Sequence, residues 1–181
     1  MAVLVEAISV VIRCDRLLTE FDNDWDAFKD TVPNRTLCAD NEVVRVGFMS
    51  PTDVENYVSS LAKRGLKYIV DGTAQDLIVV DQQRGPAAPC EWIEFGHVNL
   101  DKESKKRVAA CRLVGSTGSV VVAPEGWIFG ESLSASFGFV PNGQMEKSLT
   151  FYHHQDGLDV YQNRLTGKEV FIGRTNPDKE S

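Results

Sequence analysis

The chain has 181 residues, of which 43% are hydrophobic and 25% charged, and its net charge is −7 at pH 7. This length and composition predict one globular core and exclude an intrinsically disordered chain. No basic stripe is available for a nucleic-acid backbone. The apolar segment 1–13 is interrupted by Glu6 and is too short to span a bilayer. We therefore expect neither a nucleic acid nor a membrane as partner.

The cysteine spacings bear on the redox compartment. The four cysteines lie far apart and include no CxxC pair, and the N-terminal segment lacks the basic residues that begin a secretory signal. Reduced thiols and a cytoplasmic location are therefore expected. No zinc site, redox centre or other cofactor is predicted from these spacings. The cysteines are Cys14, Cys38, Cys90 and Cys111.

The first third of the chain predicts a strand followed by a helix. Residues 2–13 are rich in β-branched side chains and predict one continuous strand. After it, apolar residues recur at spacings of three and four from Leu18 to Phe28, and Pro33 ends the pattern. The opposite, solvated face of this helix carries acidic residues.

Negative charge is concentrated in the same region. Residues 1–42 contain nine acidic and four basic residues, so −5 of the total charge of −7 lies there. Three aspartates have the spacing of the first calcium ligands in an EF-hand loop, but Ala27 stands where that loop needs glycine and Pro33 where it needs glutamate. We predict no metal site, and instead an acidic surface that binds a basic protein. Its residues are Asp22, Asp24, Asp26 and Asp30.

The segment 50–65 has the clearest helix signals. Ser50 is a natural N-cap, a proline follows in the first helical position, and Gly65 suits the end. The apolar residues between them recur with helical spacing. Strands are predicted on both sides, at 43–48 and 67–70, so this region is expected to form a β-α-β unit.

Beyond residue 70 the sequence predicts mainly strands. We therefore predict an α+β fold, with a mainly antiparallel, curved sheet and two helices from the N-terminal third packed on one face. A single domain is expected over 1–174, followed by a flexible tail at 175–181. Turn residues separate the strand segments, which are 77–80, 91–98, 107–114, 119–123, 149–154, 158–164 and 168–173.

A polar loop follows the predicted strand 77–80. It contains Asp81, Gln82, Gln83 and Arg84, and polar side chains at a strand end often bind ligands. Arg84 can hold a carboxylate or phosphate in a forked geometry. The interpretation that we favour is simpler: Asp81 and Arg84 close the loop by pairing with each other or with backbone groups.

Cys90 is the candidate nucleophile. A histidine that lowers its thiol pKa would activate it. His97 does not suit this role, because a continuous strand would place it roughly 23 Å away and on the opposite face. His153 or His154 can approach Cys90 only through folding. A buried core position is the commoner role of a free cysteine.

Three further patterns predict structure rather than chemistry. Adjacent strand residues face opposite ways, so His153 and His154 with Asp156 predict a hairpin turn and no metal site. The glycine-rich segment 115–119 lacks the lysine and the helix of a phosphate loop. An aromatic stretch predicts core packing, or alternatively a mobile apolar lid or a partner surface. It contains Trp127, Phe129, Phe137 and Phe139.

The functional hypothesis is a small, acidic, cytosolic protein-binding protein without catalytic activity. An inhibitor or immunity-type protein that masks a basic partner with its acidic surface is an example. Two alternatives stay open. One is a cysteine-dependent hydrolase or transferase with Cys90 as nucleophile and a distant histidine as base. The other is a small module that binds an anionic ligand through the strand-end loop, with Asp81, Gln83, Arg84 and Cys90.

Overall fold

The computed structural model describes residues 1–102 and 106–136, and the strands at 149–155, 158–163 and 169–173. The fold is α+β, as predicted. Within this described part, no helix is long and apolar enough to cross a bilayer. The predicted tail at 175–181 lies outside the described residues. The helices are α1 (Cys14–Glu20), α2 (Trp25–Lys29), α3 (Pro51–Arg64) and α4 (Leu133–Ser136), with a 3-10 turn at Phe129–Glu131.

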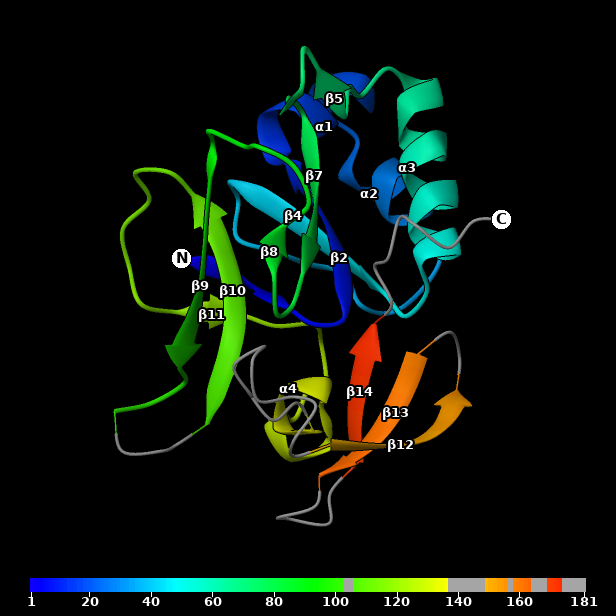
Figure 1. Cartoon of the computed structure of the whole chain (residues 1–181). Helices are drawn as coiled ribbons and strands as arrows, with labels where there is room; N and C mark the ends of the chain where they lie inside the picture. The colour runs from blue at the N-terminus through cyan, green and yellow to red at the C-terminus, as the bar shows by residue number, and fades with distance from the viewer. Residues whose placement is uncertain (103–105, 137–148, 156–157, 164–168, 174–181) are drawn as a thin grey trace.

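Two sheets, and not one, form the body of the protein (Figure 1). The central, five-stranded sheet has the order β3-β4-β2-β7-β8 and is antiparallel throughout. Its strands are β2 (Ile8–Arg13), β3 (Cys38–Ala39), β4 (Val43–Phe48), β7 (Leu77–Asp81) and β8 (Gly85–Pro86). The second sheet has the order β11-β1-β10-β9, and only its β1–β11 pair is parallel. It contains β1 (Ala2–Val5), β9 (Ile93–Asn99), β10 (Arg107–Leu113) and β11 (Val121–Val122).

The central sheet is buried on both faces. Alternate residues of β2, such as Val10, pack with side chains of α1, α2 and α3 on one face. Val11 belongs to the opposite face, where Ala109 and Cys111 of the second sheet lie. Three layers result: helices, central sheet and second sheet. This arrangement explains why β2, β4 and β7 have nearly continuous apolar sequences.

The predicted strand 2–13 is broken at Glu6 and Ala7. Ala7 has a left-handed backbone conformation, with φ 48°, and the chain passes here from the second sheet into the central one. Gln82 holds this kink. The Gln82 side-chain Oε1 accepts a hydrogen bond from the Ala7 N–H (2.8 Å), and the Gln82 backbone N–H donates to the Ala7 carbonyl (2.9 Å).

The continuous helix predicted from Leu18 to Phe28 is also wrong. Asp22 and Asn23 both have positive φ, 53° and 60°, and they separate α1 from α2. Asparagine and aspartate tolerate this conformation better than most residues. Three helices, rather than two, therefore come from the N-terminal third.

The helix α3 is confirmed with its caps. Ser50 Oγ accepts from the Asp53 N–H at 3.2 Å, and Gly65 adopts φ 118° at the C-cap. The strand expected after it is only β5 (Ile69–Val70), which pairs with β6 (Thr73–Ala74) in a separate hairpin. The strand parallel to β4 is β7, since both are antiparallel to β2 between them.

A buried carboxylate ties this hairpin region to α1. Asp76, whose side chain is 7% exposed, pairs through Oδ1 with Arg16 Nε at 2.9 Å. Its second oxygen accepts the Lys67 N–H at 2.8 Å. The contact joins two segments that are 60 residues apart in sequence.

The strands predicted after residue 90 are present. The last three form a separate antiparallel sheet of β12 (Leu149–Gln155), β13 (Leu158–Asn163) and β14 (Glu169–Gly173). The nearby helix α4 lies between this sheet and the second sheet, where it contacts both β14 and β10 (Figure 1).

Candidate ligand pocket at the junction of the two sheets

The predicted acidic surface is exposed. Asp22, Asp24, Asp26 and Asp30 all lie on the α1–α2 connection, on α2 or at its C-cap, and all four are exposed. Two of them have partners within the chain: Asp24 Oδ1 accepts from the Ala27 N–H at 2.9 Å, and Asp26 pairs with Lys29 at 2.6 Å. Among the described residues, no group of three His, Cys, Asp or Glu side chains is arranged to hold a metal ion.

The strand-end loop is closed by its own hydrogen bonds, as the simpler interpretation predicted. Asp81 Oδ1 accepts from the backbone N–H groups of Gln83 and Arg84, both at 2.9 Å. Gln82 is buried and supports the kink at Ala7. The Arg84 side chain is exposed. The loop therefore serves the scaffold of the N-terminal strand.

Cys90 is half-buried on the segment before β9. Burial raises its pKa above the ordinary thiol value, despite hydrogen bonds from the backbone of Trp92 and Ile93 that act in the opposite direction. An activated nucleophile requires a lowered pKa. His97 Nε2 lies 2.9 Å from the Gln82 carbonyl oxygen. The side chains of His153 and His154 lie outside the described residues.

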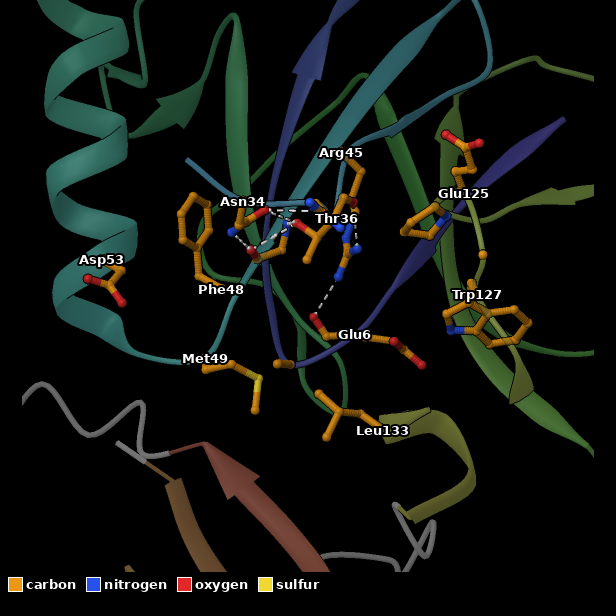
Figure 2. A pocket seen from close by; sticks show the side chains of 15 residues that line it. Glu6, Asn34, Thr36, Arg45, Phe48, Met49, Asp53, Glu125, Trp127 and Leu133 are labelled. Carbon is orange, nitrogen blue, oxygen red and sulfur yellow. Dashed lines mark hydrogen bonds between the residues drawn. The ribbon is translucent and has the colours of Figure 1, made fainter. Parts of the chain in front are cut away.

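A pocket of about 460 Å³ opens where the kink between β1 and β2 meets the end of β4 and the segment before α4 (Figure 2). This volume lies within the range of small-molecule sites. None of the binding residues predicted from the sequence lines it. Its wall contains Glu6, Ala7, Asn34, Arg35, Thr36, Arg45, Gly47, Phe48, Met49, Asp53, Pro124, Glu125, Gly126, Trp127 and Leu133.

Arg45 is the buried cation of this pocket and is only 2% exposed. Nε donates to Ser9 Oγ at 2.8 Å, Nη1 to the Thr36 carbonyl at 3.1 Å and Nη2 to the Glu6 carbonyl at 2.9 Å. These acceptors are neutral, and no carboxylate of the described residues lies within ion-pair distance. Burial consequently lowers the pKa of Arg45 from its ordinary value. Each terminal nitrogen also keeps an N–H without an acceptor in the described part of the chain.

The absence of a side chain at Gly47 makes room for this guanidinium. A Cβ at position 47 would lie 2.3 Å from Arg45 Nη2 and 2.7 Å from Cζ. The loop that completes the wall is attached to the same glycine. Thr36 Oγ1 accepts the Gly47 N–H at 2.6 Å, and Asn34 Nδ2 donates to the Gly47 carbonyl at 2.7 Å.

Glu6 is the buried acid of the pocket and is 9% exposed. Its Oε1 accepts from the N–H and the hydroxyl of Ser134, at 3.0 and 2.6 Å, and so attaches α4 to the kinked strand. Oε2 has no hydrogen-bond donor among residues that the structure describes.

Trp127 supplies a further unmatched polar group. Its ring is half-buried and stacks edge-to-face on Phe129, with centroids 6.2 Å apart. Its indole Nε1 is buried and has no acceptor in the described segments. The other two aromatic residues of this stretch, Phe137 and Phe139, lie outside the described residues. The pocket thus combines unmatched donors on Arg45 and Trp127 with an unmatched acceptor on Glu6.

The sequence carries one signal for this site. Glu6 and Arg45 are isolated charged residues within segments that are otherwise apolar and buried. A charge at such a position must find partners in the interior. This signal lies inside the strand segments, whereas the candidate ligand-binding residues predicted above lie in a loop beyond a strand end.

Comparisons with protein-family models, with curated proteins and with solved structures find no match to this chain. Function is therefore inferred from the geometry of the pocket and from the charges of the surface.

Proposed function

We propose that this protein is a small binding protein, and that its pocket recognises an anionic group of a small ligand through Arg45. One observation carries the proposal. Arg45 is 2% exposed, lines a pocket of about 460 Å³ and has no carboxylate within ion-pair distance among the described residues. A buried charge without an ion-pair partner is costly, and a ligand anion would offset that cost. This is the anionic-ligand alternative from the sequence, with Arg45 in the place of Arg84.

A titration with a matched pair of ligands tests this proposal. 3-Phenylpropionate should shift the NMR signals of the Arg45 Nε–H, the Gly47 amide and the Trp127 indole N–H in a saturable manner. Its neutral amide should bind at least tenfold more weakly, because charge-assisted hydrogen bonds are about twice as strong as neutral ones. Absence of saturable shifts with the carboxylate would refute the proposal.

Substitutions locate the binding site. Arg45→Gln should abolish binding of 3-phenylpropionate, whereas Arg84→Gln, at an exposed arginine, should leave it unchanged. Should Arg45→Gln fail to fold, Leu133→Trp provides a second variant that fills the pocket from α4. Binding that persists at wild-type affinity in both pocket variants would place the anion elsewhere.

A second function is favoured by the exposure of four aspartates on one short segment. Through this surface the protein would mask a basic protein partner, as an inhibitor or immunity-type protein does. Partner capture from a lysate of the native host should weaken as salt is raised, because exposed charges are screened. It should be lost when Asp22, Asp24, Asp26 and Asp30 are replaced by Asn.

A charge-matched variant is the control for that experiment. It replaces four exposed acids elsewhere by their amides and should capture the partner normally. Equal capture by both variants would refute a role for the acidic segment. The control positions are Asp15, Glu55, Asp71 and Glu91.

A further inference from the structure

The pocket buries one charge of each sign. Arg45 and Glu6 are its buried ionisable residues, whereas Arg35, Asp53 and Glu125 are exposed at its rim. Arg45 donates to the main-chain carbonyl of Glu6, so the two residues share one wall. Their side chains nevertheless diverge: Figure 2 shows the Glu6 side chain extending away from Arg45 and toward Trp127. The two side chains are therefore not ion-paired, although the charge of Glu6 partly opposes the lowering of the Arg45 pKa by burial.

These separate groups define what a ligand must carry. Arg45 and Trp127 offer N–H donors without acceptors among the described residues, which suits the oxygens of a carboxylate. Glu6 Oε2 offers an acceptor, which suits an ammonium group. A carboxylic acid without an amine would bring a second negative charge beside Glu6. An amine without a carboxylate would leave Arg45 without an ion-pair partner.

The rest of the wall is largely apolar. Phe48, Met49, Pro124 and Leu133 line the pocket together with the ring of Trp127. Such surfaces favour a hydrocarbon side chain on the ligand. The whole lining contains three acidic and two basic residues. A doubly charged phosphate is therefore disfavoured relative to a zwitterion.

We propose that the ligand is an α-amino acid with an apolar side chain, with its carboxylate bound at Arg45 and its ammonium group at Glu6. This inference rests on the proposed function of the pocket and adds recognition of a second, cationic group.

Three ligands with the same ring and chain test it: L-phenylalanine, 3-phenylpropionate, which lacks the amine, and 2-phenylethylamine, which lacks the carboxylate. Inorganic phosphate is a fourth probe. Affinities are measured on the full chain by calorimetry and by the NMR signals of Arg45 and Trp127. We expect L-phenylalanine to bind at least tenfold more tightly than the other three, since each missing charge removes a charge-assisted hydrogen bond.

Two conservative variants assign the groups. Glu6→Gln keeps an oxygen that can accept from Ser134. It should reduce the ratio of the affinities for L-phenylalanine and 3-phenylpropionate to about one. Trp127→Phe keeps an aromatic ring and removes the N–H, so it should weaken both carboxylates about equally, by about tenfold. The NMR spectrum of each variant reports whether it folds. If a variant does not fold, the comparison of the four ligands on the unmodified protein still tests recognition of the amine.

The outcomes separate this inference from the proposed function. Equal affinity for L-phenylalanine and 3-phenylpropionate would overturn recognition of the amine and leave anion binding intact. Tighter binding of phosphate would overturn the amino-acid class in the same way. Failure of every carboxylate and of phosphate to bind, or binding of 2-phenylethylamine as tight as that of L-phenylalanine, would overturn both.

Discussion

Replacing Gly47 by alanine is expected to lower the free energy of unfolding by about 3–6 kcal/mol, through its effect on Arg45. The new Cβ would lie 2.3 Å from Nη2, where ordinary contact begins at 3.4 Å, so the guanidinium must move. A shift of about 1 Å breaks its hydrogen bonds to the carbonyls of Thr36 and Glu6. Each bond from a charged group contributes about 1.5–3 kcal/mol, and two such bonds give the expected range.

Urea unfolding at neutral pH, followed by tryptophan fluorescence, measures this loss. Gly96→Ala in β9 is the matched control, because no atom lies within 4 Å of the Cβ that it introduces. Its stability should be unchanged or slightly higher, since alanine restricts the unfolded chain. A loss below about 1 kcal/mol for Gly47→Ala would refute the reasoning. It would mean that the Arg45 guanidinium does not lie against Gly47 in the wall of the pocket.

Two further predictions concern the scaffold. Asp76→Asn should lower the free energy of unfolding in urea by about 1.5–3 kcal/mol, because it removes a charge-assisted bond to Arg16 from a carboxylate that is 7% exposed. Asp26→Asn, at the exposed pair with Lys29, is the control and should have no measurable effect. Equal losses in the two variants would contradict the stabilising role of the Asp76 pair. Burial raises the pKa of Cys14 from 9.0 to about 11, so its contribution to stability is complete below pH 9 and is lost as the pH rises toward 11. Cys14→Ala should reduce that alkaline loss by about 2–3 kcal/mol, and identical pH profiles of variant and wild type would show that the thiol does not titrate in this way.

Local signals predicted the elements whose ends are set by local chemistry. The helix α3 begins after Ser50 and ends before Gly65 because both caps act within a few residues of sequence. The break at Ala7 has no such signal, since alanine has no preference for a left-handed backbone. It is held by distant groups: the side chain of Gln82 and the guanidinium of Arg45, which binds the Glu6 carbonyl. One sequence does not show which distant residues meet.

For the same reason, the sequence predicted the exposed acidic residues but not the pocket. The acidic residues from Asp22 to Asp30 could be predicted as exposed, because charged residues interleaved with a helical apolar pattern usually lie on its solvated face. The pocket depends on segments that only the tertiary structure brings together: the kink at Glu6, the end of β4, and the stretch before Leu133. The break between α1 and α2 could have been predicted from the sequence, since Asp22 and Asn23 belong to residue types that readily adopt positive φ.

The division of the N-terminal strand between two sheets has a consequence for synthesis on the ribosome. Val3, Leu4 and Val5 pair with residues 109–111, more than 100 positions later, whereas β2 finds both of its neighbours by residue 81. Pairs so distant in sequence form slowly. The nascent chain can therefore assemble its central layer while its first residues still wait for β10, and we expect anchoring of the N-terminus to be a late event in folding.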